Sequence, residues 1–180
     1  MTEFARVVVP NRARPLWVAF FLAIAASTAS AEPYRVGDTL EGFSLEDQHG
    51  EVRSLEDTVE VVLFSRDMEG GDLLKSALAE LEPGTLAARN ALYVSDISGM
   101  PSLISRLFAI PNMRKRPYSM ALDRDGATTE RLPDEPGKAT LIFCEQRTIT
   151  RIEHADSAAS VRGLLGLDGP AATTLEEDTQ

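Results

Sequence analysis

The stretch VEVVLFSRDMEGGD, residues 59–72, constrains the fold more than any other part of the sequence. Residues 60–65 are short, apolar and β-branched, which is typical of a strand buried on both faces of a sheet. A charged loop with two glycines follows, and then an amphipathic helix. This order predicts the central strand, loop and helix of an α/β domain, where functional groups usually lie in the loop at the carboxyl end of the strand.

Buried strands alternate with amphipathic helices along the rest of the chain. Further strands are predicted at residues 91–95 and 118–122, and hairpins around the turns at residues 47–50 and 145–147. We expect the apolar strands to lie in one sheet, with helices packed against it. The strands concerned are residues 61–64, 92–94 and 141–143.

Three helices follow from the spacing of apolar residues. The first is predicted at residues 73–81, with Asp72 as its N-cap, and the second at residues 103–108. A last helix should begin at Asp156 or Ser157. We expect the first two helices to flank the sheet with their apolar stripes.

The first 31 residues have the pattern of a secretory signal peptide. Three arginines precede an uncharged run at residues 15–30, and small residues at positions 29–31 allow cleavage before Glu32. The strongly apolar part, residues 16–26, is shorter than the ~20 residues of a membrane-spanning helix. We therefore expect a mature protein that is periplasmic or secreted and no longer membrane-bound, with an uncleaved anchor as the alternative.

The composition is that of one globular domain with an acidic surface. The chain has 180 residues, of which 43% are hydrophobic, and a formal net charge of −10. This charge argues against nucleic acid and anionic membranes as partners. The domain is predicted to span residues 32–166, and the acidic tail at residues 167–180 to be disordered.

The element order and several local patterns resemble the thioredoxin-like fold in its peroxiredoxin-type (redoxin) version. VGDTLEGFSLEDQHGEVRSL is similar to the opening of peroxiredoxins, and VEVVLFSRD to the strand that leads into their active-site loop. YSMALDRDGATTERL and GKATLIF resemble two later strands, and the layout is also similar to periplasmic proteins of the YtfJ type. The resemblance implies a thioredoxin-like three-layer α/β/α sandwich with a mixed central sheet.

The loop lacks the groups with which peroxiredoxins reduce peroxide. Those proteins place a cysteine there, because a thiolate at a helix N-terminus has a lowered pKa and attacks peroxide. This chain has no cysteine in the loop, and a lysine stands where the resemblance implies an arginine. The residues of this candidate loop site are Arg66, Asp67, Met68, Glu69, Gly70, Gly71 and Lys138.

Without a cysteine, the loop has two interpretations. Its polar residues would form a pocket at the helix N-terminus, where free backbone N–H groups favour an anion. The interpretation we favour is a solvated turn, in which Gly70 and Gly71 allow positive φ and Met68 covers the core.

Cys144 is the only cysteine, so an internal disulfide and a dithiol cycle within one chain are both impossible. It ends the apolar strand ATLIFC, which predicts a buried, inert thiol, although it is the one candidate for catalysis. His49 and His154 lack zinc-site spacing, and no phosphate-binding glycine motif is present. We therefore expect no metal and no cofactor.

A basic cluster, Arg114, Lys115 and Arg116, is the candidate surface for an acidic protein partner, with a solvated loop as the alternative. Two functions stay open. The favoured one is an exported, redox-inactive thioredoxin-like domain that acts by binding a partner or a small ligand. The other is a thiol-dependent oxidoreductase that uses Cys144 or the cysteines of a partner.

Overall fold

The structure is a computed structural model that describes residues 32–167. The predicted signal peptide, and all of the predicted tail beyond Leu167, lie outside these residues. Within them, no helix is long and apolar enough to cross a bilayer.

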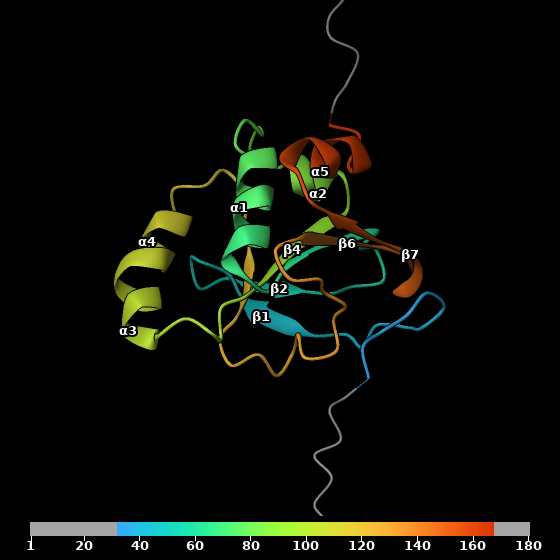
Figure 1. Ribbon diagram of the computed structural model, residues 1–180, viewed down its shortest axis with the longest axis horizontal. Coiled ribbons are helices and arrows are strands. Elements are labelled where there is room, and N and C mark those ends of the chain that lie inside the picture. Colours follow the sequence, from blue (N-terminus) through green and yellow to red (C-terminus); the bar gives the residue numbers. More distant parts are fainter. Residues whose placement is uncertain (1–31, 168–180) are drawn as a thin grey trace, which may run out of the picture. The chain divides into compact units, whose positions relative to one another are not determined.

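A five-stranded mixed sheet in the order β5-β4-β3-β6-β7 forms the centre of the fold (Figure 1). The strands β3, β4 and β5 are parallel, β6 pairs antiparallel with β3, and β7 pairs antiparallel with β6. The strands are β3 (Val61–Ser65), β4 (Ala91–Asp96), β5 (Ala121–Asp123), β6 (Ala139–Glu145) and β7 (Thr148–Ala155). The three apolar strands expected in one sheet therefore do lie together in it.

One face of this sheet is covered by helices. Leu63, Tyr93 and Leu141 point to this side and pack with Leu74 of α1 and Val161 of α5. The helices are α1 (Met68–Ala77), α2 (Thr85–Ala88), α3 (Ser102–Ile104), the π-helical turn η1 (Ser105–Ala109), α4 (Ile110–Met113) and α5 (Ala158–Leu164). The last helix starts as predicted, because the Ser157 side chain caps it by accepting a hydrogen bond from the Ser160 N–H.

The opposite face has a core of its own. Val62 and Phe64 point to this side, since successive residues of a strand face opposite ways. They pack with Tyr34 and Leu40 near the start of the described chain and with Leu132 of the connection between β5 and β6. A small hairpin, β1 (Ser44–Glu46) and β2 (Val52–Ser54), lies at the predicted turn and contributes to this layer.

The predicted α/β class, thioredoxin-like fold and mixed central sheet are confirmed by this topology. The parallel β3-α1-β4 unit lies beside the antiparallel β6-β7 pair, and α5 follows. Three layers are present. No helical residue among those described belongs to the second core, so its covering layer is made of the hairpin and loops instead of helices.

The helix α1 begins earlier than the sequence predicts. Its N-cap is Asp67, whose carboxylate accepts a hydrogen bond from the Gly70 N–H, and Asp72 lies inside the helix in an ion pair with Lys75. The predicted cap at Asp72 is therefore wrong. Because the helix includes Gly70 and Gly71, neither glycine has positive φ, contrary to the prediction.

The apolar stripe at residues 103–108 also differs from the prediction, because it faces solvent. The exposed fraction is 68% for Leu103 and 64% for Phe108. The proline at position 111 has no N–H and its ring clashes with the carbonyl four residues earlier, so a regular helix is interrupted here. The backbone widens into η1, after which the Ile110 N–H donates to the Ser105 carbonyl and Ile110 alone turns inward.

Candidate functional site

The candidate site lies where β3 and β4 end and α1 begins. A cavity of about 860 Å³ opens here, between α1 on one side and the α3–η1–α4 segment on the other. Its floor is formed by the buried residues Tyr93, Ile97, Tyr118 and Met120. The carboxyl end of the central strands, which the sequence indicated, is therefore a hollowed part of the surface.

Asp67 connects the start of α1 to the loop that precedes β6. One carboxylate oxygen accepts from the Gly70 N–H at 2.7 Å, and the other accepts from the Gly137 N–H at 2.6 Å. Gly137 has a φ of +76°, which a residue with a side chain rarely adopts. One N–H of the first helical turn, that of Gly70, is thus bound by an acid of the chain itself, and the charge of this acid works against an anion there.

Gly70 and Lys138 are in contact through their backbones. A Cβ atom added at Gly70 would lie 2.3 Å from the Lys138 carbonyl oxygen, so only glycine allows this approach. The Lys138 ammonium forms an ion pair with Glu135 at 2.5 Å, and this hydrogen bond raises the pKa of Lys138. The Lys138 charge, the candidate cation of the loop site, is therefore paired with an acid on the same loop.

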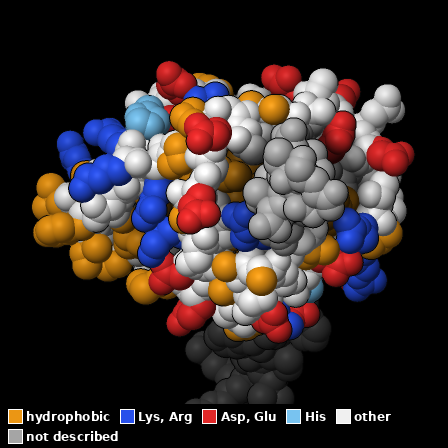
Figure 2. All heavy atoms as spheres, turned by 90° about the horizontal axis from the view of Figure 1, so that it is seen from above, with side chains coloured by type: hydrophobic (Ala, Val, Ile, Leu, Met, Phe, Trp, Pro, Cys, Tyr) orange, Lys and Arg blue, Asp and Glu red, His pale blue; other side chains and the backbone are white. Residues whose placement is uncertain are grey.

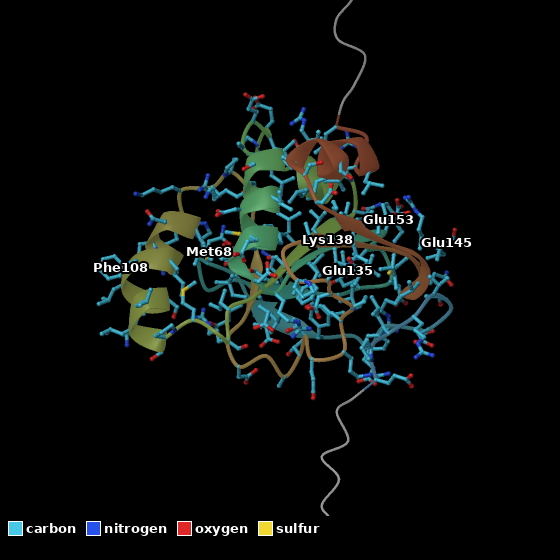
Figure 3. All side chains as sticks on the ribbon, in the orientation of Figure 1. Met68, Phe108, Glu135, Lys138, Glu145 and Glu153 are labelled. Atoms are coloured by element: carbon cyan, nitrogen blue, oxygen red, sulfur yellow. The ribbon has the colours of Figure 1, made fainter. Side chains whose placement is uncertain are left out.

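Met68 does not cover the core, contrary to the prediction. It is 75% exposed at the rim of the cavity, and Glu69 beside it is exposed as well. In Figure 3, Met68 lies on the α4 side of α1, whereas Lys138 and Glu135 lie together on the other side. The residues of the candidate loop site lie near one another, but their side chains do not converge on one point.

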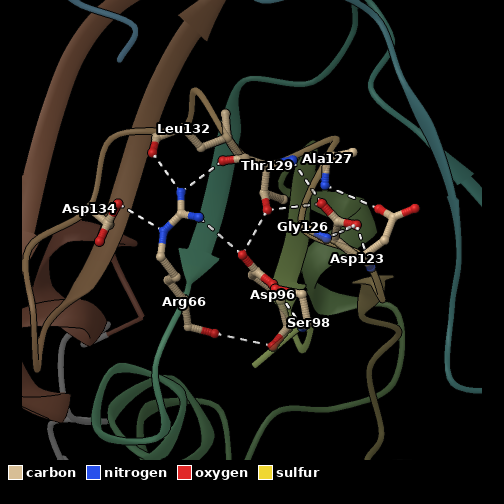
Figure 4. A network of polar contacts seen from close by, with 12 residues as sticks. Arg66, Asp96, Ser98, Asp123, Gly126, Ala127, Thr129, Leu132 and Asp134 are labelled. Atoms are coloured by element: carbon tan, nitrogen blue, oxygen red, sulfur yellow. Dashed lines mark hydrogen bonds and ion pairs between the residues drawn. The ribbon is translucent and has the colours of Figure 1, made fainter. Parts of the chain in front are cut away.

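Arg66 binds the connection between β5 and β6 to the sheet (Figure 4). Its guanidinium donates to Asp96 at 3.0 Å and to Asp134 at 2.9 Å, and it also reaches the carbonyls of Thr129 and Leu132. All of its nitrogens are therefore used. These bonds give Arg66 a structural role at the edge of the cavity.

The same network continues behind Arg66. The Thr129 hydroxyl lies between the carboxylates of Asp96 and Asp123, within hydrogen-bond distance of both. The Asp123 carboxylate also accepts from the N–H groups of Thr129 and Gly126. Asp123 and Thr129 are almost completely buried. The turn at residues 123–126 is thus held by hydrogen bonds between its own backbone and the Asp123 carboxylate.

Cys144 lies at the opposite end of β3 from the start of α1. Its N–H donates to the Glu60 carbonyl at the start of β3, and its side chain belongs to the core on the face without helices. The residue is 3% exposed, and burial raises the pKa of its thiol to about 11. These positions separate the only sulfur nucleophile from the loop.

The three basic residues of the predicted partner surface have different surroundings. Arg114 donates to the Gln48 carbonyl at 2.7 Å and so holds the hairpin turn. Lys115 is exposed and reaches only the Asn112 amide oxygen, at 3.3 Å. Arg116 is half-buried and lines the cavity. They form one segment, but Arg114 is tied to the hairpin turn, whereas Lys115 and Arg116 line the cavity.

Gln48 is a structural residue that the sequence did not reveal. It is 1% exposed, donates to the Tyr118 carbonyl at 2.7 Å and accepts from the Met120 N–H at 2.8 Å. A glutamine in a hairpin turn has no local signal for burial, since its partners lie about seventy residues away in the chain. Its role is to hold the segment before β5, which supplies Tyr118 and Met120 to the cavity floor.

In the part of the chain that the structure describes, no three or more His, Cys, Asp or Glu side chains are placed to hold a metal ion. The two histidines lie apart, with His154 beside Thr140 and Glu135.

Comparisons with protein-family models and with curated proteins gave no match. Among solved structures, the chain is similar to the peroxidoxin BcpB from Mycobacterium tuberculosis, with 18% identity over 73% of this chain and 95% of that one, at a TM-score of 0.48. It is similar to a peroxiredoxin-like protein from Aquifex aeolicus, with 9% identity over 77% and 90% of the two chains and a TM-score of 0.48.

A putative thiol:disulfide interchange protein DsbE from Chlorobium tepidum shares 14% identity over 75% of this chain and 99% of its own, at a TM-score of 0.45. Similarity at these values carries no inference about activity. The thioredoxin-like assignment rests on the sheet order, the strand directions and the place of α1 and α5.

Replacing Arg66 by methionine tests the network in Figure 4. Arg66→Met leaves the Asp96 carboxylate, whose side chain is 3% exposed, without its ionic partner. We expect the free energy of unfolding to fall by about 3 kcal/mol, as for other broken buried pairs. Urea unfolding followed by circular dichroism measures this loss.

Lys75→Met is the matched control, since it removes an exposed ion pair with Asp72. We expect it to cost less than about 1 kcal/mol. Equal losses for the two variants would contradict the structural role of Arg66.

Proposed function

We propose that this protein is an exported thioredoxin-like domain that acts by binding and performs no thiol chemistry of its own. The observation that carries this proposal is the position of Cys144. It lies beside Glu60, whereas α1 begins just after Ser65 at the other end of β3. At ~3.3 Å per residue, the two ends of this strand are roughly 15 Å apart.

The state of the thiol supports the same proposal. Attack on a peroxide or disulfide needs a thiolate in contact with the substrate. Because burial raises the pKa of Cys144 to about 11, the thiol stays protonated at neutral pH. At the start of α1, where the redoxin resemblance implies the nucleophile, the side chain is Met68, which does not ionise.

An exposed apolar surface supports a role in binding. We name Leu103, Ile104, Leu107 and Phe108 the apolar ridge; each is at least 50% exposed. Figure 2 shows hydrophobic side chains gathered on the side where α3 and α4 lie, next to lysine and arginine side chains. Contiguous apolar surface of this kind is typical of sites that bind another molecule.

The charge around the ridge indicates the chemistry of a protein partner. Residues 98–117 contain four basic residues and no acidic one, in a chain whose net charge is −10. Arg106 lies within the ridge segment and is exposed, as is Lys115. We propose that the ridge docks a protein segment with an apolar face and acidic flanks, because opposite charges favour the encounter and fix its orientation.

The absence of thiol chemistry is tested by turnover. We expect the purified protein to consume hydrogen peroxide and to reduce insulin disulfides no faster than a buffer control, with dithiothreitol as reductant. Cys144→Ser should be indistinguishable from the native protein in both assays. Sustained turnover that Cys144→Ser removes would overturn the proposal and restore the oxidoreductase alternative.

Docking on the ridge is tested by photo-crosslinking in cells. A photoreactive phenylalanine analogue at Leu107 should give adducts with acidic proteins, identified by mass spectrometry, and Arg106→Glu should reduce their yield. The same analogue at Glu80, an exposed position on the chain after α1, is the matched control. Equal yields at the two positions, or adducts that Arg106→Glu leaves unchanged, would contradict the proposed surface.

A further inference from the structure

We propose that the cavity between α1 and α4 binds a small amphipathic anion, with an apolar body and one carboxylate or sulfonate head. Two independent features combine here: an apolar cavity, and a half-buried arginine without an ionic partner at its mouth. This cavity and the proposed partner surface are separate sites, because Ile104 is the only residue of the apolar ridge that also lines the cavity.

The cavity has the size and lining of a small-molecule site. Its volume of about 860 Å³ lies within the range of roughly 300–1,000 Å³ that is usual for ligand pockets. The floor residues Tyr93, Ile97, Tyr118 and Met120 are each less than 8% exposed, so they are held in place by the core beneath them. Met100 and Met113 add flexible apolar side chains that adapt to the shape of a ligand.

The carboxylates that line the cavity are already engaged. Asp96 pairs with Arg66, and Asp72 pairs with Lys75 at 2.6 Å. Asp67 accepts from two backbone N–H groups. The charges of Asp96 and Asp72 are thus balanced by Arg66 and Lys75, whereas Asp67 keeps its negative charge at the start of α1.

Two cations remain at the mouth, Lys115 and Arg116. Across residues 32–167, the Arg116 guanidinium makes no hydrogen bond or ion pair, and Lys115 meets only an amide oxygen. Arg116 lines the same cavity as Tyr93 and Tyr118, and its charge acts against the rise that burial causes in the pKa of Tyr118.

This arrangement selects the class of ligand. A guanidinium partly withdrawn from water gains most from an anion that accepts two parallel hydrogen bonds, such as a carboxylate. The apolar floor gains from a hydrocarbon or aromatic body that displaces water from it. One molecule meets both demands when its charged head lies at Arg116 and its apolar body lies over Tyr93 and Tyr118.

Calorimetric titration with decanoate and with decanol, which share an apolar body and differ in charge, tests the proposal. The purified protein should bind decanoate saturably at one site and more tightly than decanol. Arg116→Gln should weaken decanoate binding by about tenfold or more, the usual effect of losing a hydrogen bond to a charged group, and leave decanol binding unchanged.

Three further variants complete the test. Arg106→Gln removes a neighbouring positive charge outside the cavity and should change neither affinity, whereas Arg116→Lys should retain part of the decanoate binding. Ala109→Trp places an indole at the cavity wall and should abolish binding of both probes. Circular dichroism checks that each variant is folded.

The proposal is overturned if the native protein binds no decanoate, if decanol binds as tightly, or if Arg116→Gln and Arg106→Gln weaken decanoate equally. Binding of apolar acidic peptides without binding of decanoate would assign the cavity to a protein partner and also overturn it. None of these results depends on thiol turnover, so failure here is distinct from failure of the proposed function.

Discussion

The Asp67 carboxylate holds together the part of the fold on which the candidate site depends. It binds the first turn of α1 through Gly70 and the loop before β6 through Gly137. These two hydrogen bonds hold Gly70 against the Lys138 carbonyl and fix the position of α1, which forms one wall of the cavity. Free N–H groups at the first turn of a helix favour a thiolate, and here the Gly70 N–H is already bound to a carboxylate. The interaction that secures the helix therefore also removes an environment suited to thiol chemistry.

The segment between β4 and β5 contributes to both proposed binding features. Because a proline interrupts its helix, the apolar stripe of residues 103–108 turns outward while Ile110 stays in the core. The segment carries positive charge in an otherwise acidic chain, and its last basic residue, Arg116, lies at the cavity. A ridge for a protein segment and a cavity for a small anion thus share one positively charged element, which agrees with a domain that works by recognition.

The sequence predicted the elements whose pattern is set locally. Strands β3, β4 and β6 were found because burial on both faces leaves continuous apolar runs, and α5 because Ser157 is a strong cap. The start of α1 was misplaced, since two glycines disfavour a helix and only the contact with Lys138 shows why they are there. The spacing of apolar residues identified the stripe at residues 103–108, but spacing alone does not show whether a stripe faces the core or solvent. The Arg66 network joins residues more than sixty positions apart, and no local pattern predicts it.

The most direct test of this account places a cysteine where the redoxin resemblance implies one. The variant Met68→Cys, made together with Cys144→Ser, has its only thiol at the first turn of α1. The pH dependence of its alkylation rate gives the pKa of that thiol. We predict a value near the ordinary ~8.5, because the Asp67 carboxylate occupies the helix N-terminus and Glu135 holds the Lys138 ammonium. A pKa of about 6 or lower, with peroxide consumption, would show that the site still activates a thiolate and would contradict the account.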